Sequence, residues 1–501
     1  FPFQRPRKNH QSPALSYHYT HHSPQPSNSN NSTSTERYLE PLSQCPIKPN
    51  RFTGHSRLTA SPIFNISMTP PDNLDDTRVF FNPTIIPLPD WSPNQYLIVS
   101  RIITSGLHQE NVLCEANICY TGSPNGRKKW EQPCTADDLR LLVSLGGGMR
   151  CATKPILLNV PPTPAEKCID EFEAYPDIPG FHDPRIFWSG KGEPLMIANS
   201  QSRYACFGLW LVDLRTLYNP LHVLISNATN SNDDPLRAPP LMSYPTLTEL
   251  TRNPPHSRGP IEKNWMYFSA GPGQASYIQY EIKPRKRTFA KLLGNGLTSE
   301  NLTSPVEPSC VETVPKDVQD LPSMHYDKDN VGSWHQTSNS LKLILCRRSD
   351  ESCKPAKSNT VFLAVIQRKL GNRFGLPMRY ERYFVLWSAT PPFHMLAITR
   401  HPLLFANESA SDFSAEENWD GDEEQLDAIK RGERGKDLGV YFTYTVSVSY
   451  TTERHGLEEM QMGYLDDEVV IGIGLEDAGM GYAIARVEEL LQCLKICPGA
   501  V

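Results

Sequence analysis

The sequence predicts an all-β-dominated fold of short antiparallel strands, which could form a sandwich, a barrel or a propeller. Two observations support this class. The 501 residues include 45 prolines, which favours many short strands and turns over long helices. From about residue 176, strand-like segments recur in pairs with turn residues between them. A propeller is favoured among the three because polar motifs stand at strand starts or turns, one in each strand set, where they would converge around a central axis.

Two hairpins are predicted where strand-like runs flank glycine-containing turns. The first joins residues 185–189 to 195–199, and the second joins 265–270 to 277–282. Other strands are predicted over 96–99, 341–346, 361–367, 382–387, 395–399, 442–450 and 469–475.

The last two of these strands carry further information. Residues 442–450 alternate apolar and hydroxyl side chains, which predicts a half-buried strand. Gly472 and Gly474 share one face of 469–475, where close packing or a ligand would need small residues. A short amphipathic helix is predicted over 485–494.

Composition divides the chain into three parts. Residues 1–45 are rich in Ser, Asn, Pro, His and Gln, which predicts a disordered stem. Residues 46–175 form a cysteine-containing extension, with a helix over 136–142, that packs on the β domain or contributes strands to it. Residues 176–501 hold the main part of the β-propeller.

Charge and cysteine content bound the function and the compartment. The net charge of −6 gives no basic footprint for nucleic acid. No apolar run approaches the ~18 residues that span a bilayer. Because the first residue is Phe1, an upstream signal or anchor helix would fit. Twelve cysteines and six Asn-x-Ser/Thr sequons favour a secretory lumen. The cysteine spacing favours disulfides or buried thiols over zinc, and the pairing stays open.

The most informative motif is His182-Asp183-Pro184-Arg185, which leads into a strand-like run. Pro184 fixes its own φ and biases Asp183 toward extended geometry. Asp183 could act as a general acid or base, with Arg185 as a clamp on an anion or a hydroxyl. A turn in which the two charges pair locally is the simpler interpretation.

Three further polar motifs stand near strand entries. Lys263-Asn264-Trp265 offers a cation, an amide and an indole, which suit a phosphate, a hydroxyl and a sugar ring. Residues 334–341 include the polar residues His335, Gln336 and Asn339. Residues 464–468 include Asp466 and Asp467. An ordinary strand entry and satisfied or solvated turns are the structural alternatives for these three motifs.

Together these motifs resemble those of known carbohydrate enzymes. The Asp-Pro-Arg strand start and the Lys-Asn-Trp entry are similar to those of the β-1,2-mannoside phosphorylases, which are five-bladed β-propellers. The wider pattern resembles the fungal β-mannosyltransferases over roughly residues 95–498. It is carried by residues 178–185, 335–336, 339–341, 402–404, 463–468 and 490–492. The resemblance implies a five-bladed β-propeller with an N-terminal extension, in a type II membrane protein of the Golgi lumen; secretion is the alternative.

The resemblance also implies a reaction and roles for residues. Mannose would pass from GDP-mannose to a mannoside or mannan acceptor with inversion, and Asp183 would be the base. Neither a cofactor nor a metal is expected. The leaving diphosphate would be stabilised by Arg185, Lys263 and His335. Hydroxyls would be read by Asn264, Gln336 and Asn339, Trp265 would stack on sugar or guanine, and Asp466 and Asp467 would bind acceptor.

Two other functions stay open. A glycoside hydrolase or mannoside phosphorylase on a propeller is one, and hydrolysis would require a second carboxylate, from Glu262 or residues 466–468. A non-catalytic glycan-binding domain is the other, and it would tolerate loss of Asp183. His182 stands where the phosphorylases tend to have an acidic residue, and this difference favours the transferase.

Overall fold

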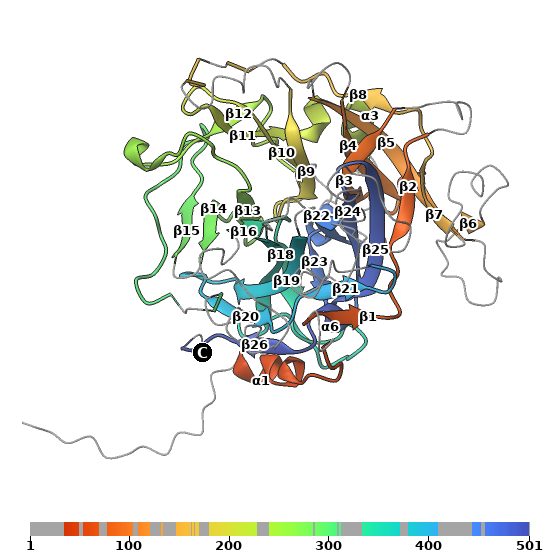
Figure 1. Ribbon diagram of the computed structural model, residues 1–501, viewed down its shortest axis with the longest axis vertical. Coiled ribbons are helices and arrows are strands. Elements are labelled where there is room, and N and C mark those ends of the chain that lie inside the picture. Colours follow the sequence, from red (N-terminus) through yellow and green to blue (C-terminus); the bar gives the residue numbers. More distant parts are fainter. Residues whose placement is uncertain are drawn as a thin grey trace, which may run out of the picture.

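Strands dominate the structure and helices are few, so the predicted all-β class is confirmed (Figure 1). This computed structural model describes residues 35–49, 54–69, 78–103, 109–120, 132–133, 147–161, 163–164, 166–169, 180–227, 240–283, 286–307, 310–311, 333–370, 379–408, 443–451 and 456–499. The helix predicted over 136–142 lies outside these residues.

Both predicted hairpins are present in separate antiparallel sheets. The first sheet has the strand order β12-β11-β10-β9, and its strands are β9 (His182–Trp188), β10 (Pro194–Gln201), β11 (Phe207–Asp213) and β12 (Thr248–Leu250). The second has the order β13-β14-β15, with β13 (Met266–Ser269), β14 (Ser276–Lys283) and β15 (Lys286–Lys291).

A third sheet continues the same pattern. Its antiparallel part contains β16 (Ser333–Gln336) and β17 (Leu341–Ile344), both paired with β18 (Thr360–Leu370), then β19 (Arg379–Ser388), β20 (Met395–Thr399) and β26 (Leu494–Ile496). The short strand β23 (Met462–Tyr464) pairs with β17 in parallel.

The fourth sheet combines strands from both ends of the chain. One antiparallel group is β3 (Phe80–Pro87), β4 (Tyr96–Ile103), β5 (Gln109–Tyr120) and β7 (Gly147–Cys151), with β6 (Gln132–Pro133) and β8 (Ile156–Leu157) beside β5. The other is β22 (Thr443–Tyr450), β24 (Glu468–Leu475), β25 (Gly479–Arg486) and β2 (Phe64–Ser67). Parallel pairing of β2 with β7 joins the groups. The N-terminal extension therefore contributes strands to the main sheets.

The half-buried character predicted for 442–450 is wrong. The hydroxyl face of β22 is as buried as its apolar face, because β22 packs against β3, β9, β18 and β19. Its hydroxyls are satisfied internally: Ser447 accepts from the Ile85 N–H and Ser449 donates to the Ile85 carbonyl. The close packing predicted at Gly472 is confirmed, since a Cβ there would meet the Pro83 carbonyl and the Ser447 hydroxyl.

Two further expectations need correction at the chain ends. The predicted helix over 485–494 is a single turn, α6 (Val487–Leu490), because Ala485 and Arg486 extend β25. Part of the predicted stem is also structured. Helices α1 (Glu36–Leu39) and η1 (Pro41–Ser43) lie within it, and Leu39 is fully buried in the core. Residues 1–34 lie outside the described part.

The remaining short elements connect these sheets. Strand β1 (Ser56–Leu58) pairs in parallel with β21 (Leu403–Phe405). The helices are α3 (Asn219–Asn227) and the short 3-10 turns η5 (Leu214–Thr216), η7 (Pro255–Ser257) and η9 (Leu457–Glu459). Among the described residues no helix is long and apolar enough to cross a membrane.

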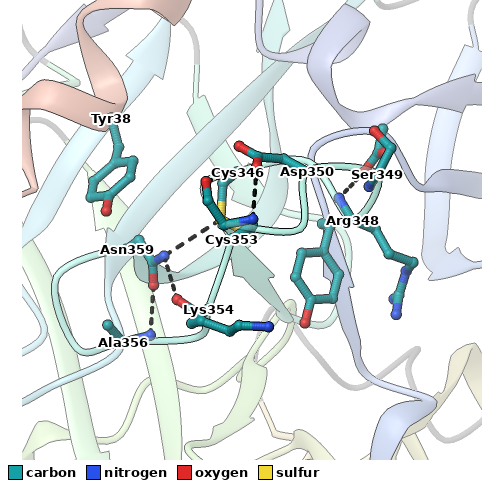
Figure 2. Close-up of a disulfide and its surroundings, with 12 residues drawn as sticks. Tyr38, Cys346, Arg348, Ser349, Asp350, Cys353, Lys354, Ala356 and Asn359 are labelled. Atoms are coloured by element: carbon teal, nitrogen blue, oxygen red, sulfur yellow. Dashed lines mark hydrogen bonds between the residues drawn. A yellow bond between two sulfur atoms is a disulfide. The ribbon is translucent and has the colours of Figure 1, made fainter.

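The prediction of disulfides is confirmed. The described bonds are Cys45–Cys493, Cys114–Cys151, Cys168–Cys206, Cys310–Cys497 and Cys346–Cys353. Figure 2 shows the last of these, which closes a loop between β17 and β18. Asn359 fastens this loop by donating to the Lys354 carbonyl and accepting from the Ala356 N–H. Disulfides fit a secreted or luminal protein.

Candidate active site

Asp183 is aimed by a β-bulge near the start of β9. Between the paired positions Arg185–Ile197 and His182–Asn199, β9 has one residue more than β10. A bulge of this kind bends a strand and re-aims a side chain. The extended geometry predicted for Asp183 is wrong, because its φ is 46°. Asp tolerates this left-handed conformation better than most residues, and such strain concentrates at functional sites.

Among the residues that the structure describes, four cationic or potentially cationic groups surround this carboxylate. Arg101 on β4 makes a short hydrogen-bonded ion pair with Asp183. Burial opposes ionisation of Asp183, but Arg101, Arg185, His182 and Lys263 together outweigh it and lower its pKa. The Asp183 side chain nevertheless keeps 34% of its surface exposed. Asp183 is therefore an ionised carboxylate in a positive environment that solvent or a ligand can reach.

Arg185, Asn264 and His335 form a hydrogen-bonded row beside Asp183. Arg185 Nη2 donates to Asn264 Oδ1 at 2.9 Å, and Asn264 Nδ2 lies 3.1 Å from His335 Nδ1. Arg185 Nη2 also donates to the Tyr444 hydroxyl at 3.1 Å. Arg185 is 3% exposed overall, so its guanidinium is fixed by its partners.

Further groups border this row. Burial and the neighbouring Lys263 lower the pKa of Lys369. The charge of Asp477 acts in the opposite direction. Burial raises the pKa of Tyr380, with added effects of Tyr444, Asp477 and Asp183. These electrostatic couplings place Lys369, Tyr380 and Asp477 around the same cluster. Asp477 in turn accepts a hydrogen bond from Asn82 Nδ2 at 3.0 Å.

The residues around Asp183 form one polar cluster. Several of them lie on or next to the first strand of an antiparallel group, which is a strand at one edge of that group. Asn82 lies on β3, Asp183 and Arg185 on β9, Asn264 just before β13, His335 on β16 and Tyr444 on β22. Figure 1 shows these strands meeting toward the middle of the molecule. Of the four polar motifs singled out in the sequence, the first three converge, as predicted.

The fourth motif does not join them. Asp466 and Asp467 precede β24, which runs antiparallel to β22, so they lie beside the end of β22 and not beside its start. The eight residues of β24 place them roughly 25 Å from the Asp477 turn. Asp466 accepts from the backbone N–H groups of Arg348 and Ser349, and Asp467 pairs with the Arg348 guanidinium. Both carboxylates therefore have partners outside the cluster, and their contact with acceptor stays a prediction.

Three other predicted binding residues are buried. Trp265 is 1% exposed and packs edge-to-face on Tyr280, so it cannot stack on a ligand. Gln336 is 2% exposed and donates to the Asn264 carbonyl. Asn339 is 4% exposed, and its Nδ2 lies 3.5 Å from the Ser340 carbonyl. By contrast, Lys263 is exposed and is coupled to Asp183.

The sequence contained signals for some of the residues that were not predicted. Arg101 is the one charged residue of β4, near the end of that strand, and it lies over the ring of Phe81 on the paired strand. Asn82-Pro83 repeats the pattern of Asp183-Pro184. It too has a positive φ, at Asn82, and a register shift against the neighbouring strand. Asp477, on a tight turn, carried no comparable signal.

The arrangement suits the handling of an anionic group beside a hydroxyl. Guanidinium and ammonium groups hold phosphate oxygens, while an ionised carboxylate can accept a hydroxyl proton. Glu262, the other carboxylate considered from the sequence, is engaged by Arg252 at 2.9 Å. Among the described residues, no group of three or more His, Cys, Asp or Glu side chains could hold a metal ion.

Comparisons with known proteins give distant structural similarities. No protein-family model and no curated protein matches the chain. A β-1,2-mannobiose phosphorylase from Listeria innocua, solved with β-1,2-mannobiose, aligns with TM-score 0.37 and 11% identity over 86% of this chain and 98% of its own. An α-L-arabinofuranosidase from Podospora anserina, solved with cellotriose, aligns with TM-score 0.23 and 9% identity. That alignment covers 65% of this chain and 94% of the arabinofuranosidase. A Dyadobacter fermentans protein of unknown function aligns with TM-score 0.29 and 8% identity. That alignment covers 86% of this chain and 100% of the other protein.

All three TM-scores are low, so these similarities carry no conclusion about function. Membership of the fungal β-mannosyltransferases, the Golgi location, the upstream membrane anchor and the number of propeller blades stay predictions.

Proposed function

We propose that this protein is a carbohydrate-active enzyme that transfers a mannosyl group between a mannoside hydroxyl and a phosphate-bearing partner, with inversion at the anomeric carbon. The observation that carries this proposal is the setting of Asp183, a partly exposed carboxylate among Arg101, Arg185, His182 and Lys263. The excess of positive charge suits a phosphate, and the carboxylate suits a sugar hydroxyl.

In the synthetic direction, Asp183 takes the proton from the acceptor hydroxyl as that oxygen attacks the anomeric carbon. The bond from this carbon to the phosphate oxygen breaks, and the leaving phosphate keeps the electron pair. Arg185 and Lys263 stabilise the charge that develops there. One displacement inverts the configuration. In the reverse direction a protonated Asp183 returns the proton to the departing hydroxyl.

Two phosphate sources share this chemistry. With GDP-mannose the protein is a β-mannosyltransferase, as its sequence resemblance implies. With inorganic phosphate it is a mannoside phosphorylase. The lowered pKa of Asp183 supports the base role that synthesis requires. An anion on the cluster would offset its cations and so favour the protonated Asp183 that phosphorolysis requires.

The fold proposed for this enzyme is a five-bladed propeller. The antiparallel sets β3-β4-β5, β9-β10-β11-β12, β13-β14-β15, β22-β24-β25-β2, and β18-β19-β20 with both β16 and β17 beside β18, would be its blades. Support comes from the first strands, since β3, β9, β13, β16 and β22 each carry or adjoin a residue of the cluster.

Hydrolysis is the second candidate function. The observation that favours it is a second carboxylate, Asp477, near Asp183. This carboxylate is coupled electrostatically to Tyr444 and Tyr380 beside Asp183, and could direct a water. A hydrolase places its two carboxyl groups about 5–9.5 Å apart across the scissile bond.

The test supplies purified protein with a short β-mannoside and, in separate reactions, with GDP-mannose or inorganic phosphate. We expect elongated product or mannose 1-phosphate, respectively, according to the natural phosphate source. Asp183→Asn should lower kcat by at least about 100-fold, since the base is lost and the shape is kept. Asp350→Asn is the control, because Asp350 lies in the exposed loop of Figure 2.

Each remaining outcome rejects part of the proposal. Free mannose released without phosphate or nucleotide would establish the hydrolase. Full activity of Asp183→Asn would remove Asp183 from the chemistry. Mannoside binding without turnover in any reaction would support a glycan-binding domain.

A further inference from the structure

Asn264 is held on three sides in a conformation that few residues adopt. Its φ is 60°, in the left-handed region. Its Oδ1 accepts from Arg185, its Nδ2 contacts His335 Nδ1, and its backbone carbonyl accepts from Gln336 Nε2 at 3.1 Å. These contacts allow the protonation of the His335 ring to be assigned.

The assignment follows from which groups can donate. A guanidinium has donors only, so the Asn264 atom that faces Arg185 must be the oxygen. The amide nitrogen therefore faces His335, and it too is a donor only. His335 Nδ1 must then be the acceptor and carries no proton. The single ring proton sits on Nε2. An imidazolium would also carry a proton on Nδ1, which would then face the Asn264 amide donor without an acceptor.

The position of Asn264 is fixed by a second row of oriented groups. Arg287 Nε donates to Gln279 Oε1 at 2.5 Å, which directs Gln279 Nε2 to Gln336 Oε1 at 2.5 Å. Gln336 Nε2 is thereby turned toward the Asn264 carbonyl. All three side chains are at most 6% exposed. Two arginines, Arg185 and Arg287, thus orient three amides and one imidazole.

We infer that Asn264 is a positioning residue that holds His335 as the neutral tautomer with its proton on Nε2. His335 then contributes a hydrogen-bond donor, while Arg185, Arg101 and Lys263 contribute the positive charge. This differs from the role as a cation that the sequence resemblance implies for His335. The tautomer rests on the hydrogen bonds alone; its use toward a phosphate oxygen rests on the proposed function.

The tautomer can be measured without activity. Two-bond proton–nitrogen NMR correlations on protein labelled with 15N-histidine distinguish the two neutral tautomers. The His335 signals are those missing from the spectrum of His335→Gln. We expect a protonated Nε2 and an unprotonated Nδ1 at neutral pH. A protonated Nδ1 in the wild-type protein would overturn the inference.

Substitutions at Asn264 test whether it is the cause. Asn264→Asp keeps an acceptor for Arg185 but presents a second acceptor to His335, so the ring proton should move to Nδ1. Asn264→Gly tolerates the positive φ and removes the amide, so both tautomers should appear. An unchanged Nε2–H tautomer in both folded variants would show that Asn264 does not set it. Asn295→Asp, on an exposed turn, is the charge-matched control.

Kinetics separate this inference from the proposed function. If the tautomer shifts in Asn264→Asp and kcat/KM for the phosphate-bearing substrate falls by about 10- to 100-fold, both stand. If the tautomer shifts but no substrate turns over even in wild type, the proposed function fails and the positioning role remains. If the tautomer shifts and kcat/KM is unchanged, His335 is outside the reaction.

Discussion

At the scale of single residues, the main finding is that Asp183 is kept ionised by its neighbours. Burial acts against its charge, and Arg101, Arg185, His182 and Lys263 overcome that effect. An anion bound among the same cations would cancel part of their field. The proton affinity of Asp183 should therefore depend on whether the phosphate-bearing substrate is present.

This dependence predicts two different acid limbs in the pH profile. The lowered pKa means that Asp183 of the free enzyme loses its charge only as pH falls below the ordinary range for Asp, near 3.9. In the complex the pKa is higher, so synthesis should fail at a higher pH. Since kcat/KM reports the free enzyme and kcat the complex, the acid limb of kcat should lie at the higher pH.

The measurement is steady-state kinetics of the synthetic reaction across the acid range, with circular dichroism to confirm folding at each pH. Arg101→Met should move the acid limb of kcat/KM to a higher pH. The substitution removes the cation that lowers the pKa of Asp183 most. Coincident limbs in wild type would contradict the coupling between anion and carboxylate.

At the scale of strands, a repeated device aims the cluster. Asn82 and Asp183 each precede a proline, each has a positive φ, and each lies at a register shift in the first strand of its set. Positive φ also marks Asn264 and Asp477. Short polar side chains tolerate this conformation, so the residues that carry chemistry also permit the bends that direct them.

Alternation and turn residues were enough to predict most strands, and β20 was predicted with its observed bounds, Met395–Thr399. They could not predict the bulge at Asp183, because a one-residue register shift depends on the neighbouring strand. They also could not predict that β24 begins far from the cluster and runs toward it, so that Asp466 and Asp467, which precede β24, lie away from the cluster. Arg101 was missed because its partner is 82 positions away in the chain.

Close packing behind the Asn82 bulge gives a prediction for stability. In Gly472→Ala the new methyl group would meet the Pro83 carbonyl and the Ser447 hydroxyl at contact distances that need backbone movement. We expect a loss of about 1–3 kcal/mol of unfolding free energy, seen as a lower Tm by calorimetry. Gly294→Ala, which has open space around its Cβ position, is the control and should leave Tm nearly unchanged.

An equal Tm for the two variants would mean that β3 and β24 can separate without cost. A lower Tm confined to Gly472→Ala would support the tight contact that fixes Asn82 and its partner Asp477.

At the scale of the whole molecule, the two ends of the chain are built into each other. β2 from the N-terminal extension pairs with β25, and β26 pairs with β20. Cys45 is bonded to Cys493, and Leu39 lies in the same core as Leu490 and Leu494. The extension is thus part of the β domain that carries the cluster.

This closure predicts unequal effects of removing two disulfides. Cys45–Cys493 spans 448 positions and Cys346–Cys353 spans 7. Loop-closure entropy assigns about 6 kcal/mol to the longer loop and about 2.4 kcal/mol to the shorter, and the other disulfides reduce the first figure to about 5. The double variant Cys45→Ala/Cys493→Ala should therefore lose more stability than Cys346→Ala/Cys353→Ala.

Calorimetry on the two purified double variants tests this difference, and limited proteolysis near Glu36 locates it. Loss of Cys45–Cys493 should lower Tm further and expose α1 to cleavage, because the bond fastens the segment that carries Leu39 to the core. The shorter loop keeps its hydrogen bonds from Asn359 and Asp466 when its disulfide is removed, which limits the loss there. A larger drop for Cys346→Ala/Cys353→Ala would show that the local loop, and not closure of the chain ends, governs the stability of the β domain.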